Sequence, residues 1–186
     1  MTARRRLLVV SLIVTGACAD GPVAPGSDVN HEFGPQASTH PDVRRVKMLD
    51  TCDTESFDAV LGPGSCVIDR GTTFDQFIHE LTQHQTVQSW RNNPHFTGEP
   101  VGTTLDIRND GGEVHTFTRV AQFGGGFVDI LNQLSGNPIP AAECLNFANI
   151  GFVPSGGSET QVLPAPGANH YQCCIHPWMR STIVGR

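Results

Sequence analysis

The sequence predicts an all-β fold, a β-sandwich over residues 87–186, preceded by an extension that contains one short helix. From Thr86 onward, short segments alternate apolar with polar residues or are rich in β-branched and aromatic residues, which is typical of strands. Clusters of Asn, Gly and Pro separate these segments and indicate turns. About 100 residues are enough for one sandwich domain. The candidate strand segments read VQSWRNNP, GTTLDIRND, EVHTFTRVA, ETQVLPAP, HYQCCI and RSTIVGR.

The region before the sandwich divides into a linker and an extension. Residues 19–46 are rich in Gly, Pro, Ser and Asp and have no apolar period, so we expect a flexible linker. The extension, residues 47–86, holds Cys52 and Cys66 around a Leu-Gly-Pro-Gly turn, a spacing that favours a local disulfide. Its second half predicts an amphipathic helix, capped by either Thr72 or Thr73. The apolar face of that helix is formed by Phe74, Phe77, Ile78 and Leu81.

The first 18 residues have the pattern of an export signal peptide. A basic cluster, residues 4–6, precedes the apolar run LLVVSLIVTGA, which is too short to span a membrane permanently. The sequence VTGAC ending at Cys18 resembles a bacterial lipobox, whose cysteine carries lipid. Ordinary cleavage at the Ala17-Cys18-Ala19 pattern is the alternative. Both predict an exported bacterial protein, either periplasmic or anchored to the membrane as a lipoprotein through Cys18.

The charge balance excludes one class of partner and favours another. The chain has 12 Lys and Arg against 18 Asp and Glu, a net charge of −6 at pH 7, and export would remove three of the arginines. An acidic protein is a poor match for nucleic acid, which is bound through clustered Lys and Arg. We therefore expect a monomer with no nucleic-acid partner and with a surface that complements a basic protein.

One segment near the C-terminus combines three metal-binding side chains. In HYQCCIHPWM, Cys173, His176 and Met179 follow one another at intervals of three residues. A thiolate, an imidazole and a weak thioether, completed by a second imidazole, are the donor set of a copper ion that cycles between Cu(I) and Cu(II). The second histidine must come from elsewhere. His115 is the candidate, because a turn containing two glycines leads into the strand that carries it.

These motifs resemble the plastocyanin- and amicyanin-type cupredoxins, which are blue copper proteins. The resemblance covers about residues 86–186 and rests on a Gly-Thr-Thr strand, an Asn-x-Gly-Gly turn, a strand-borne His-Thr and the string YQCCIHPWM. It implies a Greek-key β-sandwich that holds one type 1 copper ion. The equatorial ligands that it implies are His115, Cys173 and His176, and the axial ligand is Met179.

A second cysteine, Cys174, lies beside the expected ligand. Neighbouring residues of a strand point to opposite faces, so only one of the two can face the site, and the spacing to His176 selects Cys173. Cys174 would then face away and pair with Cys144, while the two cysteines of the extension pair with each other. A vicinal disulfide between Cys173 and Cys174, a zinc site, or ordinary core packing of the histidine and methionine are the alternatives.

We expect an electron carrier without enzymatic activity. A single type 1 site supports one-electron exchange with a redox partner, for example a basic cytochrome, whereas a copper oxidase needs a second copper cluster and the chain has no His-x-His set. The resemblance implies that electrons pass through His176 at the solvent edge, inside an apolar collar of Pro177 and Trp178. A copper chaperone or storage protein without redox turnover is the alternative. Such a protein favours Met-rich sites, and the chain has only three Met.

Overall fold

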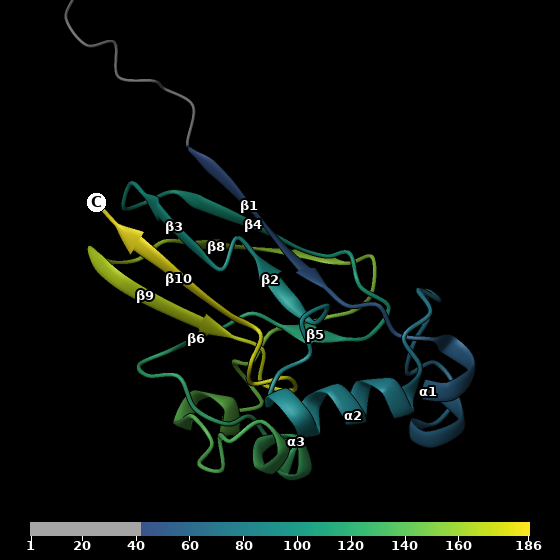
Figure 1. Ribbon diagram of the computed structural model, residues 1–186. Helices are drawn as coiled ribbons and strands as arrows, with labels where there is room; N and C mark the ends of the chain where they lie inside the picture. The colour runs from purple at the N-terminus through teal and green to yellow at the C-terminus, as the bar shows by residue number, and fades with distance from the viewer. Residues whose placement is uncertain (1–41) are drawn as a thin grey trace, which may run out of the picture. The chain divides into compact units, whose positions relative to one another are not determined.

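The computed structural model describes residues 42–186 as two sheets with helices gathered at one end (Figure 1). The predicted signal peptide, Cys18 and most of the predicted linker lie outside the described residues. None of the helices in the described part is long and apolar enough to cross a membrane.

Two four-stranded sheets form the sandwich that the sequence predicts. The first sheet has the order β2-β1-β4-β8, the second has the order β3-β10-β9-β6, and a short ribbon pairs β5 with β7. The first sheet consists of β1 (Val43–Leu49), β2 (Arg91–Asn93), β4 (Thr104–Asn109) and β8 (Ser158–Val162). The second sheet consists of β3 (Phe96–Glu99), β6 (Thr118–Val120), β9 (Gly167–Gln172) and β10 (Arg180–Gly185). The ribbon consists of β5 (His115–Thr116) and β7 (Phe152–Val153).

Alternation along the strands builds the core of the sandwich. In β4, Leu105 and Ile107 are buried, while Asp106 and Arg108 lie at or near the surface. Tyr171 of β9 stacks on Phe117, with ring centroids 4.6 Å apart and an interplanar angle of 9°. Full burial of one such apolar side chain contributes about 1.5–3 kcal/mol, so contacts of this kind stabilise the core.

Strand β1 begins at Val43, inside the segment for which the sequence predicts a linker. It pairs in parallel with β4 and antiparallel with β2, so it lies inside the first sheet and not before it. Val46 and Met48 enter the core, whereas Arg45 and Lys47 point outward to Asp106 and Asp110. These charged residues mask the strand pattern in VRRVKML, which is why sequence reasoning passed over it.

The extension contains two helices, one more than the sequence predicts. Helix α2 (Phe74–His84) is the predicted one, and Thr73 caps it in a reciprocal capping box with Gln76. Helix α1 (Thr54–Leu61) was missed, although Asp53 caps its N-terminus by accepting from the Ser56 N–H group. A short helix α3 (Asp129–Leu134) and a 3-10 turn (Ala142–Leu145) follow β6. The helices lie at the end of the sandwich that also carries β5 and the loop between β9 and β10 (Figure 1).

Both predicted disulfides are present. Cys52 bonds to Cys66 across 14 residues, and Cys144 bonds to Cys174 across 30 residues. Cys173 is the free cysteine of the described part and is buried, so a vicinal disulfide with Cys174 is excluded.

Removal of the first disulfide should destabilise the protein without changing its fold. Closing a loop of 14 residues stabilises by about 3 kcal/mol on the chain-entropy account. We therefore expect the double variant Cys52→Ala/Cys66→Ala to lose about 3 kcal/mol of unfolding free energy in a urea titration. An unchanged urea midpoint would show that this bridge does not constrain the unfolded chain.

Candidate metal centre

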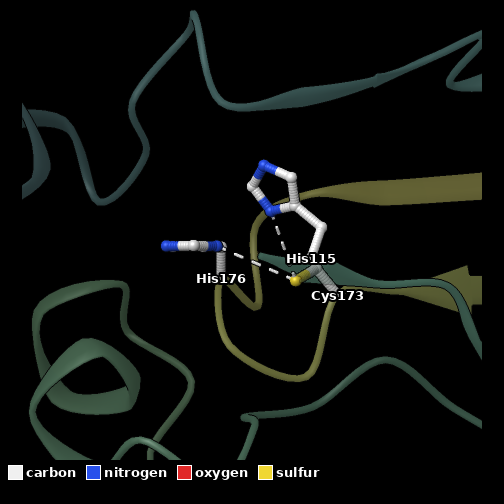
Figure 2. Close-up of side chains that lie close together, drawn as sticks. All are labelled: His115, Cys173 and His176. Carbon is white, nitrogen blue, oxygen red and sulfur yellow. Dashed lines mark hydrogen bonds between the residues drawn. The ribbon is translucent and has the colours of Figure 1, made fainter. Parts of the chain in front are cut away.

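Three of the predicted ligands converge on one buried point. His115 begins β5, Cys173 follows β9, and His176 lies in the loop that leads to β10. The Sγ atom of Cys173 lies 3.8 Å from Nδ1 of His115 and 3.8 Å from Nδ1 of His176. Figure 2 shows the two rings turning these nitrogens toward the sulfur. In the described part of the chain, one potential ligand atom from each of the three lies within 4.8 Å of the others.

Backbone hydrogen bonds shape the loop that carries Cys173 and His176. The N–H group of Cys173 donates a hydrogen bond of 3.0 Å to the carbonyl oxygen of Met179. The N–H group of Met179 donates a hydrogen bond of 2.9 Å to the carbonyl oxygen of His176. The N–H group of Thr116 donates to Sγ of Cys173 at 3.4 Å, which ties the sulfur to β5. These hydrogen bonds close the loop on itself.

The far nitrogen of His115 is held by a buried carboxylate, Asp50. Nε2 of His115 lies 2.8 Å from Oδ2 of Asp50, and both side chains are fully buried. This contact assigns the Nε2 proton to the Asp50 bond and leaves Nδ1 for the site. Asp50 directly follows β1, so the part of the chain predicted to be an extension supplies the support of a candidate ligand.

The turn before His115 wraps around the same carboxylate. The N–H groups of Gly112 and Glu113 donate to Asp50 at 2.9 and 3.1 Å. A Cβ atom on Gly111 would lie 2.1 Å from Oδ2 of Asp50, so only glycine allows this approach. The Gly-Gly turn before His115 therefore gives the Asp50 carboxylate room to approach the backbone.

The far nitrogen of His176 faces a second buried carboxylate, Glu113. Nε2 of His176 lies 3.5 Å from Oε2 of Glu113, which also accepts a hydrogen bond from Nε1 of Trp90. Burial raises the pKa of Glu113, against the lowering effects of His176 and Trp90. Each candidate histidine ligand therefore has a carboxyl group on the side away from the sulfur, as metal-binding histidines commonly do.

His176 is covered, which corrects the expectation that it forms the solvent edge of the site. Its side chain is only 2% exposed, and Pro177 is buried as well. Phe77 of α2 meets the ring edge-on at a centroid distance of 6.3 Å, and Trp178 lies 5.5 Å away. The expected apolar collar around an exposed His176 ring is therefore absent, because Phe77 of the extension covers that ring.

The charges at the site stabilise one another. Burial alone would raise the pKa of Asp50, but the His115 hydrogen bond and charge and two backbone N–H groups lower it to about 2. Burial alone would lower the pKa of His115, but Asp50 and Cys173 raise it to about 10. Burial would raise the pKa of Cys173, yet the two histidines bring it well below its usual value. This lowered pKa favours the thiolate form of Cys173, the form that binds metals.

The donor set fits a soft metal ion. Metal bonds of roughly 2.3 Å to sulfur and 2.0 Å to nitrogen allow one ion to reach both atoms of a pair 3.8 Å apart. A metal on Nδ1 of His115 would replace the proton there and leave the Nε2 bond to Asp50 intact. Met179 is fully buried and belongs to the same apolar cluster as Cys173. Its role as the axial ligand stays a prediction.

Sequence reasoning found the converging residues and missed the two that support them. Asp50 lies 65 residues from His115, and nothing local marks it as a partner. Glu113 would have been easier to identify from the sequence, because it lies two positions before His115 in the turn. A ligand histidine requires an acceptor for its second nitrogen, and that requirement could have suggested an acid in this turn.

The comparisons with known proteins point to similar structures only. No protein-family model matches the sequence, and no curated protein matches it. The chain is similar to a purple cupredoxin from Nitrosopumilus maritimus at 19% identity, over 54% of this chain and 86% of that one, with a TM-score of 0.40. A mutant of amicyanin in the Cu(I) form has 16% identity, coverage of 52% and 73%, and a TM-score of 0.36. A mutant fern plastocyanin has 14% identity, coverage of 52% and 89%, and a TM-score of 0.35. Similarities this low do not establish a function, which must rest on the geometry of the site.

Proposed function

We propose that this chain is an exported type 1 copper protein that transfers single electrons between redox partners. The observation that carries the proposal is the convergence of two histidine Nδ1 atoms on the thiolate of Cys173 inside a closed core. Cys173, His115 and His176 would hold the ion as equatorial ligands, with Met179 as a weak axial ligand. Bound there, copper supplies a centre that gains and loses one electron.

The protein residues contribute a rigid, dry environment around that centre. Asp50 orients His115, and Glu113 and Phe77 limit the movement of His176. The Thr116 N–H group fixes the sulfur. Ligands held in this way change position little between the two oxidation states, which favours fast electron exchange over chemistry on a substrate.

Burial of the three ligands argues against the alternative function of a copper chaperone. His115 and Cys173 are fully buried, and His176 is nearly so. A protein that hands over its metal needs ligands that an acceptor can reach, whereas this centre would retain its ion. An acidic body remains suited to a basic redox partner.

Copper loading tests the ligand assignment directly. Addition of Cu(II) should produce an intense visible band from charge transfer between Cys173 and copper, and Cys173→Ser should abolish that band. The control is Cys144→Ser/Cys174→Ser, which removes both partners of the neighbouring disulfide and should keep the band. A colourless control beside a coloured Cys173→Ser variant would show that the wrong cysteine has been assigned.

Asp50 should act on the metal through His115. Asp50→Ala is expected to weaken copper affinity by roughly 10–100-fold, because His115 loses the group that orients it. Asp50→Asn keeps an acceptor for Nε2 but removes a buried negative charge, so the reduction potential should rise while most of the affinity returns. Asp75→Ala on the exposed side of α2 is the matched control. Equal affinity in Asp50→Ala and wild type would mean that the contact does not orient the ligand.

Met179 should tune the site without being needed to form it. Met179→Leu conserves side-chain volume, and the equatorial ligands should still bind copper and give the visible band. The reduction potential and the band position should change, because the axial donor is lost. Identical spectra and potentials in the two proteins would assign Met179 to core packing only.

A further inference from the structure

The route by which electrons leave the proposed centre cannot be an exposed His176. Phe77 covers one edge of that ring, Trp178 lies beside it, and Glu113 faces its far nitrogen. A partner protein approaching this side would contact α2 and not the ligand. The sulfur side of the centre is therefore the remaining direction in which an electron could leave.

Two short bonded routes lead from the sulfur of Cys173 toward the surface. The first continues along the chain to the Cys174 carbonyl oxygen, which accepts a hydrogen bond of 2.9 Å from the Phe127 N–H group. The second crosses the hydrogen bond from Thr116 to the sulfur, and Thr116 is paired with Phe152 between β5 and β7. The first route ends at Phe127 through a hydrogen bond, and the second ends at Phe152, the residue opposite Thr116 in the β5–β7 ribbon.

These two phenylalanines meet a third on the surface. Phe127 lies 5.1 Å from Phe147 and 6.0 Å from Phe152, measured between ring centroids. Phe147 is 59% exposed and Phe152 is 49% exposed. Phe127, Phe147 and Phe152 are called the phenylalanine patch below. Large aromatic groups exposed together are typical of a contact surface, since burying them in the core would stabilise the fold more.

The fold holds this patch firmly against the residue next to the ligand. Cys174 is bonded to Cys144, three positions before Phe147. Phe127 packs on the cluster of buried residues to which this disulfide belongs. A Cβ atom on Gly126 would lie 1.8 Å from the Cys174 carbonyl oxygen, so glycine is required for Phe127 to come this close. The disulfide and Gly126 both hold the phenylalanine patch close to Cys174, the neighbour of the sulfur ligand.

Charge indicates the kind of partner. From Val120 to Met179 the chain has no Lys or Arg, and its charged residues there are Asp129, Glu143 and Glu159. The segments that carry the patch all lie in this stretch, and the exposed Arg119 just before it lines a hollow together with Glu143 and Asn146. A protein that presents an apolar centre within a basic rim would complement it, and small interfaces of this type suit brief redox encounters.

We propose that the phenylalanine patch is the docking surface for a redox protein with a basic rim, and that electrons leave the centre through Cys173, Cys174 and Thr116. The proposal rests on the proposed copper function. Held by His115, Cys173 and His176, a Cu(I) ion would give one electron to the one-electron centre of the partner and become Cu(II). No bond forms or breaks, and no proton moves.

Stopped-flow oxidation of the copper-reduced protein tests the route, with ferric cytochrome c as a basic protein acceptor and tris(phenanthroline)cobalt(III) as a small one. The double variant Phe147→Ser/Phe152→Ser should react about tenfold more slowly with cytochrome c, as loss of a central aromatic contact predicts. Its reaction with the cobalt complex and its visible spectrum should match wild type. Phe96→Ser, which removes a phenylalanine that is 62% exposed on β3, should leave both rates unchanged.

Three results would overturn the docking proposal. They are a wild-type rate with cytochrome c in the double variant, an equal loss in Phe96→Ser, and a loss that also appears with the cobalt complex. Sedimentation of the wild type adds a fourth: a dimer that the double variant abolishes would make a second copy of this chain the occupant of the patch. Absence of the copper band in the wild type would instead refute the proposed function itself.

Discussion

The buried contact between Asp50 and His115 is the interaction on which the site depends. It connects the residue that follows β1 to the strand that carries His115, two positions that are 65 residues apart in the sequence. Burial of an ionised carboxylate is expensive unless it is paired and hydrogen-bonded. Asp50 meets that condition through His115 and the N–H groups of Gly112 and Glu113. The same bonds that satisfy the charge therefore set the direction of the His115 ring.

This contact explains why the chain before residue 87 belongs to the functional unit. Asp50 directly follows strand β1, the Cys52 to Cys66 bridge comes next, and helix α2 supplies the ring of Phe77 that covers His176. The Cys52 N–H group also donates to Asp50, so the disulfide and the carboxylate stabilise one corner together. A sandwich cut at residue 87 would keep all four predicted ligands and Glu113, but it would lose Asp50, which holds His115, and Phe77, which covers His176.

The accuracy of the sequence-based predictions followed the range of the interactions concerned. The proximity of Cys173 and His176 could be predicted because loop spacing is a local property. The Cys144 to Cys174 bridge could be predicted from strand alternation, which turns Cys174 away from the site, and from the number of cysteines that remain to pair. The cap of α2 could be predicted for the same reason. Strand β1 could not, because its arginines and lysine conceal two core residues until parallel pairing with β4 is known. The burial of His176 depends on Phe77, 99 positions away, and no local pattern announces such a contact.

A covered His176 is compatible with rapid electron exchange if the electron enters and leaves on another side of the proposed centre. Phe77, Trp178 and Glu113 exclude water from the imidazole side, and there they can fix the ring without obstructing a partner. Electron tunnelling requires a short bonded path and not an open ligand, and the sulfur side offers one through Cys174. Because Cys174 is bonded to Cys144, that path is covalently attached to the surface segment beneath Phe147. On the proposed route, the second cysteine of the Cys-Cys pair has a physical reason to lie beside the predicted ligand: its disulfide connects the outer surface segment to the residue next to Cys173.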